Sequence, residues 1–207
     1  MNIKQLIQKS AGSLAIVSAI VLMTGCQATI EKVPTDSSTS PLAPHPITAE
    51  SMPPIEVTPP IFIHCGAADK MTDSEGNVWV ADEGFADGEA YQADDAQVAN
   101  TKDPELYRSE RYGLSAYDFG VPNGTYTVKL LFAEVYSGIT GPGDRVFSFN
   151  VQGHEFKDFD IWVKAGGPNK ADIESVDVEV TNNILNITFT PNVENPKVDG
   201  IEILPKS

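Results

Sequence analysis

The chain has 207 residues, of which 29 are acidic and 14 basic, for a formal net charge of −15. Such a charge repels nucleic acid and anionic membrane surfaces, so it excludes a nucleic-acid partner and favours a neutral or cationic ligand. The length accommodates one domain of ordinary size beside shorter accessory segments.

The first 25 residues have the features of an export signal rather than of a folded domain. Lys4 and Lys9 provide the basic start of an apolar stretch at residues 11–23. This stretch is too short to span a bilayer comfortably and fits the core of a signal peptide. It runs into LMTGC at residues 22–26, which resembles the lipobox of bacterial lipoproteins.

The lipobox resemblance implies that Cys26 carries a diacylglycerol group and becomes the first residue of the mature chain. Several acyl chains, palmitate among them, would anchor the protein stably where a single chain is marginal. Gln27 follows the cysteine, and the absence of an aspartate there is typical of lipoproteins passed on to the outer membrane. The expected location is therefore the bacterial cell envelope. An ordinary cleaved signal is the alternative.

Residues 26–60 have the composition of a tether. Eight of the fifteen prolines fall within residues 27–60, among many serines and threonines. Such a segment cannot bury a core and favours an extended, polyproline-like conformation. We therefore expect three parts: a signal peptide at 1–25, the lipidated cysteine and tether at 26–60, and one domain at 61–207.

The cysteines give no support for a disulfide. If Cys26 is lipidated, Cys65 has no partner in the chain. Cys65 ends the apolar, strand-like run that begins at Ile61, so we expect a buried and unreactive thiol.

Strand signals dominate the domain. Tyr126, Val128, Leu130 and Phe132 alternate along one face of a strand, and the preceding Asn123-Gly124 predicts a hairpin turn. No segment shows helical periodicity over ten residues. We predict an all-β fold, an antiparallel two-sheet β-sandwich of the jelly-roll type. Further apolar runs separated by Gly, Pro and Asn turns lie at residues 145–151, 172–181, 184–190 and 198–204.

Short runs in this domain resemble one family. In chain order they are WVADEGF (79–85), LYRSERYG (106–113), LLFAEVY (130–136), DFDIWVKAGGPNKA (158–171) and ENPKVDGIEIL (194–204). Together they are similar to the malectin domain, a carbohydrate-binding β-sandwich of the galactose-binding-like type. The resemblance extends from about residue 61 to residue 204.

The resemblance implies a sugar site made by loop aromatics and an acidic residue at one edge of the sandwich. Tyr112, Tyr136 and Glu194 match ligand positions of the family. Aromatic rings pack on the C–H faces of a sugar, and carboxylates accept hydrogen bonds from its hydroxyls. The sequence departs from the family at Ser137, where an aromatic residue is common, and Glu194 stands where animal malectin has aspartate.

The first third of the domain should supply a further aromatic residue. Tyr91 and Phe85 compete for this role, and we favour Tyr91. Tyr107 is a weaker candidate, because it could equally belong to the core. Trp79 is expected in the core, and Glu110 and Glu134 are expected to be buried framework charges, which would require partners.

These observations predict a membrane-tethered, lectin-like module that binds neutral oligosaccharide, with glucose-containing glycans as the family expectation. It is not expected to be an enzyme, because the domains that it resembles are binding modules. Among 29 acidic residues some carboxylate pair will always lie at a glycosidase separation, so their abundance is no evidence for hydrolysis. The alternative is an envelope lipoprotein that docks a protein partner and has lost its sugar site. A small glycosidase is the least favoured interpretation.

No cofactor is expected. The segment Asp73–Asn77 places its glycine wrongly for a calcium-binding EF-hand loop and instead predicts a hairpin turn. A structural calcium held by scattered oxygen ligands stays an open alternative.

Overall fold

The computed structural model describes residues 54–206. The predicted signal peptide, Cys26 and nearly all of the predicted tether lie outside the described residues. Within residues 54–206 the chain forms strands almost throughout, with two helical segments of a single turn or little more, η1 (Pro104–Tyr107) and α1 (Ile161–Ala165). None of the helices in this range is long and apolar enough to cross a membrane.

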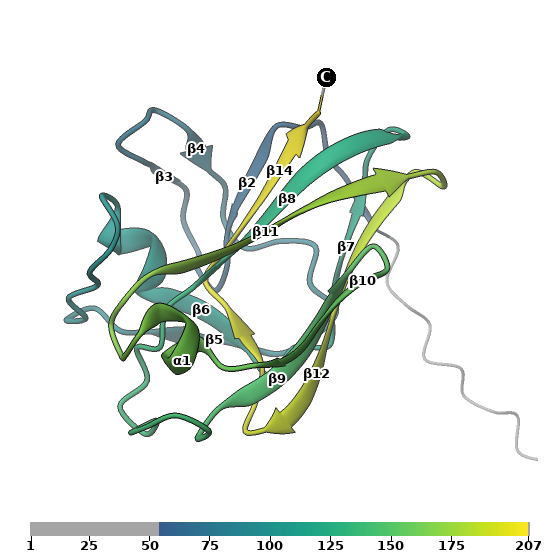
Figure 1. Ribbon diagram of the computed structural model, residues 1–207. Coiled ribbons are helices and arrows are strands. Elements are labelled where there is room, and N and C mark those ends of the chain that lie inside the picture. Colours follow the sequence, from purple (N-terminus) through teal and green to yellow (C-terminus); the bar gives the residue numbers. More distant parts are fainter. Residues whose placement is uncertain (1–53, 207) are drawn as a thin grey trace, which may run out of the picture. The chain divides into compact units, whose positions relative to one another are not determined.

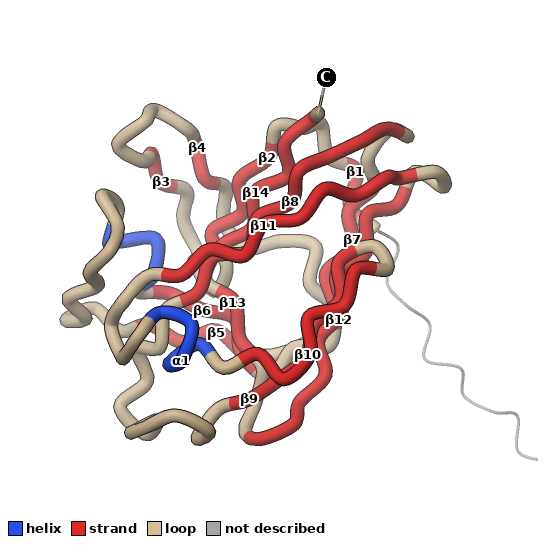
Figure 2. The backbone as a smooth tube through the Cα atoms, viewed as in Figure 1, coloured by secondary structure: helices blue, strands red, loops and turns tan. Residues whose placement is uncertain are grey.

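Two main sheets form the body of the domain (Figures 1 and 2). One contains, in spatial order, β1 (Ile55–Glu56), β7 (Ala116–Gly120), β12 (Ile184–Val193), β9 (Val146–Val151) and β10 (His154–Phe159). The other contains β11 (Asp172–Val180), β8 (Gly124–Phe132), β14 (Gly200–Pro205) and β2 (Ile61–His64). All pairs in both sheets are antiparallel except β1 with β7.

The inner faces of the two sheets share one apolar core. The alternating residues of β8 are buried as predicted, from 5 % exposed at Tyr126 to fully buried at Val128 and Phe132. Phe132 packs against the rings of Phe147 and Phe149 in the facing sheet, with centroids 6.0 and 5.6 Å apart. Alternation with a period of two thus brings one side of each strand into the core, and the predicted β-sandwich is confirmed.

The turn at Asn123-Gly124 does not make the predicted hairpin. It joins β7 to β8, which belong to different sheets. A type I′ hairpin turn requires positive φ at both central residues, and neither residue has it. Instead, Asn123 accepts a hydrogen bond from the backbone N–H of Asn183 at 2.7 Å, so the turn packs against the turn before β12.

The folded domain begins earlier than residue 61. Ile55 and Glu56 pair in parallel with Phe119 and Gly120, and Ile55 packs against the core. The apolar residues Ile55 and Val57 explain this difference, because they interrupt the otherwise polar and proline-rich composition of the segment.

Two small sheets extend the sandwich. β3 (Met71–Thr72) and β4 (Val78–Trp79) form the hairpin predicted around Asp73–Asn77. Trp79 is 1 % exposed, which confirms its place in the core, and its indole donates to Asp73 at 3.0 Å. Cys65 is buried and free, as expected.

The second small sheet has three strands in the order β13 (Lys197–Val198), β6 (Ser109–Tyr112) and β5 (Glu89–Gln92). Figure 2 shows it beside the two main sheets, below β8 and β14 in that view. Most of the predicted site residues lie on this sheet or on loops that reach it. The position of the sheet therefore determines where the candidate site forms.

Candidate functional site

One face of the three-stranded sheet collects the polar and aromatic residues of the site. Tyr112 pairs directly with Glu89 on one side and with Lys197 on the other, and Glu110 pairs with Tyr91. Paired residues share a face, and so do residues two apart on one strand. All five side chains therefore project from the same face.

Above this face lies a cavity of about 160 Å³. Tyr91 and Tyr136 meet edge to face, with ring centroids 5.8 Å apart and planes at 85°. Tyr136 is 45 % exposed, although it is a large aromatic side chain. The cavity is lined by Tyr91, Glu110, Tyr112, Tyr136, Arg145 and Glu194.

Glu110 and Arg145 form the floor of the cavity, and a buried cation, Lys197, lies beneath it. Lys197 is fully buried, and its Nζ lies 2.5 Å from Oε2 of Glu110 and 2.9 Å from Oδ1 of Asp199. It also donates to the backbone carbonyl of Ala133. Burial alone would lower the pKa of Lys197, but the charges of Asp199 and Glu110 raise it above its ordinary value. Lys197 is therefore a cation throughout the physiological pH range.

Asp199, like Lys197, has no exposed surface. Burial raises the pKa of its carboxyl well above the ordinary value, while the ammonium of Lys197 acts in the opposite direction. One of its oxygens accepts from the backbone N–H of Ala133 at 2.5 Å. Asp199, which lies between β13 and β14, is thus connected to the residue that follows β8.

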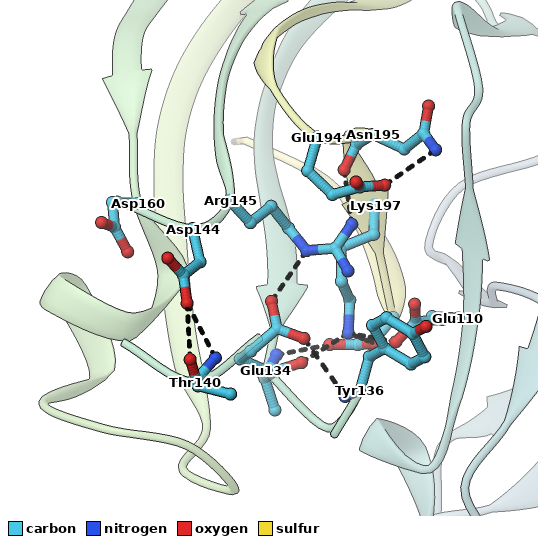
Figure 3. A network of polar contacts seen from close by, with 12 residues as sticks. Glu110, Glu134, Tyr136, Thr140, Asp144, Arg145, Asp160, Glu194, Asn195 and Lys197 are labelled. Atoms are coloured by element: carbon cyan, nitrogen blue, oxygen red, sulfur yellow. Dashed lines mark hydrogen bonds and ion pairs between the residues drawn. The ribbon is translucent and has the colours of Figure 1, made fainter. Parts of the chain in front are cut away.

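A second ion pair lies beside the first (Figure 3). Arg145 donates through Nε to Glu134 at 2.8 Å and through Nη1 to the carbonyl of Asn195 at 2.5 Å. The other oxygen of Glu134 accepts from the backbone N–H of Tyr136 at 3.2 Å. One arginine therefore connects the loop that bears Tyr136 to the turn that bears Glu194. The prediction that Glu110 and Glu134 are buried and paired is confirmed.

Two polar atoms of the floor are left for a ligand. Within residues 54–206, Oε1 of Glu110 and Nη2 of Arg145 make no protein hydrogen bond, although both residues line the cavity. A carboxylate oxygen accepts and a guanidinium nitrogen donates. The floor therefore offers an acceptor and a donor whose positions are fixed by the ion pairs behind them.

Glu194 has an unusual backbone conformation. Its φ is 59°, in the left-handed region, which glycine and asparagine adopt more readily than glutamate. Oε1 of Glu194 accepts from the side-chain amide of Asn195 at 3.0 Å. This conformation costs about 1 kcal/mol or more for such a residue.

The structure brings four of the predicted site residues together. Tyr91, Tyr112, Tyr136 and Glu194 all line the cavity.

The preference for Tyr91 over Phe85 agrees with this geometry. Phe85 lies instead with its ring 3.3 Å from the guanidinium carbon of Arg111, which follows Glu110 on β6 and so projects from the opposite face of the sheet.

Tyr107 also lies away from the cavity. It is 2 % exposed and packs in a second apolar cluster with Trp79 and Leu131. Burial raises the pKa of its hydroxyl group above the ordinary value. Of the two positions expected for this residue, the structure favours the core.

The sequence reasoning did not propose Glu110 and Arg145 as site residues. The position of Glu110 two residues before Tyr112, on one strand, was an available signal, because such residues share a face. Arg145 has no local signal, since a long-range ion pair brings it to the cavity. No group of three or more His, Cys, Asp or Glu side chains in the described part of the chain is arranged to hold a metal ion.

A β-sandwich with a tyrosine-rimmed, polar-floored cleft at a loop edge belongs to the class of lectin-like folds. The chain matches the Malectin domain family over residues 60–201, which is more than half of its length. The protein therefore belongs to the malectin domain family, whose domain is a carbohydrate-binding, lectin-like module.

Individual relatives agree with this assignment. Malectin-A of Xenopus laevis is 30 % identical over 124 residues, covering 51 % of this chain and 44 % of that protein. A probable LRR receptor-like serine/threonine-protein kinase of Arabidopsis thaliana is 39 % identical over 95 residues, covering 41 % of this chain and 9 % of the kinase. The chain thus spans less than half the length of these relatives.

Solved structures share the fold. A beta-glucuronidase of Bacteroides uniformis superposes with a TM-score of 0.64 at 18 % identity, over 71 % of this chain and 18 % of the enzyme. The ANXUR1 extracellular domain of Arabidopsis thaliana superposes with a TM-score of 0.61 at 17 % identity, over 70 % of this chain and 47 % of that one. At these identities the similarity shows the fold alone.

Replacing Lys197 by methionine should destabilise the domain strongly. The change leaves Glu110 and Asp199 buried without their cation, and breaking a buried pair from one side costs about 3–5 kcal/mol. Urea unfolding followed by tryptophan fluorescence measures the effect. The matched control is Lys206→Met, because Lys206 forms an exposed ion pair with Asp177 and such pairs contribute little. A Lys197→Met domain as stable as the native one would contradict the conclusion that Lys197 stabilises the domain by neutralising Glu110 and Asp199.

Replacing Glu194 by asparagine should separate stability from ligand recognition. Asparagine adopts the left-handed region readily, so the free energy of unfolding should stay constant or rise by up to about 1 kcal/mol. The carboxylate at the cavity is lost at the same time, so ligand affinity should fall. Thermal unfolding and a ligand titration on the same sample measure both quantities. A clear drop in stability would show that Glu194 has a structural role.

Proposed function

We propose that the domain binds a neutral oligosaccharide in the cavity above the three-stranded sheet. One observation carries the proposal: tyrosines and charged residues from segments far apart in the sequence converge on a single hollow. Tyr91 and Tyr112 come from neighbouring strands, Tyr136 and Arg145 from the two ends of a loop, and Glu194 from a turn near the C-terminus.

The chemistry of the lining suits a sugar. The tyrosine rings offer surfaces for the C–H faces of a pyranose ring. Oε1 of Glu110 and Nη2 of Arg145 accept from and donate to its hydroxyls. At and beneath the cavity, four carboxylates outnumber two cations, which supports a neutral ligand over an acidic sugar. The carboxylates are those of Glu110, Glu134, Glu194 and Asp199, and the cations are Arg145 and Lys197.

The cavity has the size for one sugar ring. Its volume of about 160 Å³ equals roughly five water molecules in the liquid and lies below the ~300 Å³ at which larger ligand pockets begin. A few aromatic contacts and hydrogen bonds contribute about 1 kcal/mol each against the cost of association. We therefore expect dissociation constants roughly between micromolar and millimolar. Glucose-containing glycans, the family expectation, are the first candidates.

We infer binding without hydrolysis. The oxygen Oε2 of Glu110 and both oxygens of Glu134 are occupied by Lys197, by Arg145 and by the backbone of Tyr136. Glycoside hydrolysis requires a carboxyl group that gains and loses a proton during the reaction. Carboxylates that are held by ion pairs and backbone hydrogen bonds suit the recognition of hydroxyls better. The similarity to a beta-glucuronidase covers 18 % of that enzyme and supports no catalytic role.

Replacing Tyr136 by alanine should abolish detectable glycan binding without unfolding the domain. Tyr136 is 45 % exposed and contributes to the rim and not to the core, so its removal takes away a sugar platform at little structural cost. A glycan array probed with the native and variant domains (residues 54–207) measures this. The matched control is Ile173→Ala, because Ile173 is also half exposed, at 51 %, and does not line the cavity.

The array result separates the proposed functions. Binding by the native domain and the control, lost in the Tyr136 variant, supports the lectin function and identifies the sugar class. No binding by a folded native domain, at concentrations that detect millimolar affinity, contradicts it. Membrane pull-downs would then test the alternative of a docking module for an envelope protein.

We further propose that the protein is a lipoprotein tethered to the outer membrane of the bacterial envelope. The lipobox-like LMTGC sequence and the proline-rich segment after it support this proposal. The tether would hold the sugar-binding domain away from the membrane surface. Many copies on one cell would then raise the avidity of a weak single site.

Replacing Cys26 by serine should release the protein from the membrane. Serine cannot form the thioether to diacylglycerol, so the variant should lose incorporation of labelled palmitate and move from the membrane fraction to the soluble fraction. The control is Cys65→Ser, because Cys65 is buried in the domain. Equal membrane association of the Cys26 variant and the native protein would overturn the lipoprotein assignment.

A further inference from the structure

A buried histidine lies on the side of β6 that faces away from the cavity. His64, the last residue of β2, is 8 % exposed, and its Nε2 lies 2.7 Å from the hydroxyl oxygen of Ser109 on β6. Ser109 precedes Glu110 on the strand, so the two side chains project from opposite faces. The Ser109 hydroxyl donates to the carbonyl of Cys65 at 3.0 Å and must therefore accept from the imidazole. The neutral ring thus carries its proton on Nε2 and a lone pair on Nδ1.

The lone pair on Nδ1 has no counterpart. The atom is buried and has no hydrogen-bond partner among the described residues, which is rare for a buried polar atom. The backbone carbonyls of Glu105 and Leu106, both in η1, favour a second proton on the ring. Because Nε2 already carries one, this proton goes to Nδ1. A carbonyl oxygen attracts an N–H and repels a lone pair, so protonation changes the contact between the ring and η1 from repulsive to attractive.

The surroundings of His64 keep the ring neutral in the folded domain. Burial lowers the pKa of His64 below its ordinary value, and the carboxylate of Asp82 opposes this effect only in part. Asp82 is itself paired with Arg111 at 2.6 Å. β14 and the residue after β4 meet His64 through Gly200 and Val80, which carry no charge. A proton on the ring therefore arrives in a site that is built for the neutral form.

We propose that His64 is a pH switch that regulates the sugar site. In acid, a proton on Nδ1 draws η1 toward the ring, β6 shifts with it, and glycan affinity falls. At neutral pH the ring is uncharged and the site keeps the arrangement described above. This inference rests on the proposed function, because it concerns the regulation of the same cavity.

The position of η1 suits this role. It is a single 3₁₀ turn without a side-chain cap at Asp103, and the backbone hydrogen bonds at its ends are 3.2 Å long, so a small displacement breaks few bonds. One residue separates it from β6. β6 in turn pairs Glu110 with Tyr91 of β5, and both residues line the cavity. A shift of η1 therefore reaches the floor and the rim of the site.

The coupling acts in both directions, as thermodynamic linkage requires. If a proton on His64 weakens glycan binding, a bound glycan makes the ring harder to protonate by the same factor. The unfolded chain also binds this proton more readily than the folded domain does. The free energy of unfolding should therefore decrease as the pH falls below about 6.5, the ordinary pKa of histidine.

The first test follows the two histidines of the domain (residues 54–207), whose apolar core lies entirely within these residues. His154 is exposed at the start of β10 and serves as the internal control. NMR signals of both rings are recorded from about pH 8 to about pH 5, with and without saturating maltose. Maltose should move the titration of His64 to lower pH by about 0.7 unit, which corresponds to a coupling of about fivefold. The titration of His154 should not change.

The second test measures maltose affinity in the native domain and in the variants His64→Gln and His154→Gln. Glutamine keeps a donor for Ser109 but stays uncharged at every pH. Between about pH 7.5 and about pH 5.5, the native domain and the His154 variant should lose affinity about fivefold, and the His64 variant should not. Burial raises the pKa of Asp172 and of Asp199, but both are present in all three proteins, so the difference reports His64 alone.

The outcomes separate the switch from the function that it regulates. An equal loss of affinity in all three proteins, or a His64 titration that maltose leaves unchanged, overturns the switch and leaves the proposed function intact. If the His64 variant does not fold, the ring titrations of the native domain decide. Failure of the native domain to bind maltose or any glycan on the array overturns the proposed function and the regulation with it.

The movement of η1 has a readout that needs no ligand. The backbone N–H of Leu106 donates to the carbonyl of Asp103 at 3.2 Å. Its protection against hydrogen exchange should fall in acid in the native domain and stay constant in the His64 variant, after correction for the intrinsic effect of pH. Equal protection in both proteins at every pH shows that His64 does not displace η1, and overturns the switch whatever the glycan titrations give.

Discussion

The candidate site depends on one buried cation. Lys197 has no exposed surface, so its charge must be balanced inside the protein, and Glu110, Asp199 and the carbonyl of Ala133 do this. Glu110 belongs to β6, Asp199 lies between β13 and β14, and Ala133 directly follows β8. A buried charge that loses one partner is costly, so the three segments are held in one arrangement. The three-stranded sheet can therefore present Tyr91, Tyr112 and Glu110 on one face although its strands are only two to four residues long.

The second ion pair extends this constraint to the loops. Arg145 binds Glu134 and the carbonyl of Asn195, and Glu134 also accepts from the backbone of Tyr136. The loop with Tyr136 and the turn with Glu194 are thereby fixed to each other before any ligand arrives. Preorganisation of this kind lowers the entropy lost on binding, which matters for a site whose individual contacts are weak. The left-handed conformation of Glu194 fits the same picture, because the surrounding bonds maintain a backbone that glutamate alone would rarely adopt.

The sequence predicted the aromatic part of the site better than its charged part. Tyr112, Tyr136 and Glu194 lie in short runs that the family shares, and alternation along β8 predicted a core strand that the structure confirms. Glu110 and Arg145 reach the cavity through strand register and through an ion pair between residues far apart in the chain, which no local pattern encodes. The error at Asn123-Gly124 has a related cause: a local turn signal cannot say whether the strands that it joins enter the same sheet. The role of Phe85 was ambiguous because its position depends on a contact with Arg111 of β6, which is distant in the sequence and lies on the face opposite to the cavity.

Ser137 stands where an aromatic residue is common in the family, and this difference affects the rim of the cavity and not its floor. Ser137 supplies no ring, but Tyr136 lies folded over Gly138, where any Cβ would collide with its ring, and it meets Tyr91 edge to face. The rim therefore keeps three tyrosines around the cavity. The floor is anchored by buried ion pairs, whereas Tyr136 on the rim is 45 % exposed and Tyr91 and Tyr112 are half-buried. Changes on the rim should therefore cost less folding stability than changes on the floor. In the proposed function, affinity and the choice of sugar would then diverge within one fold, while the preference for an uncharged ring would depend on the buried carboxylates.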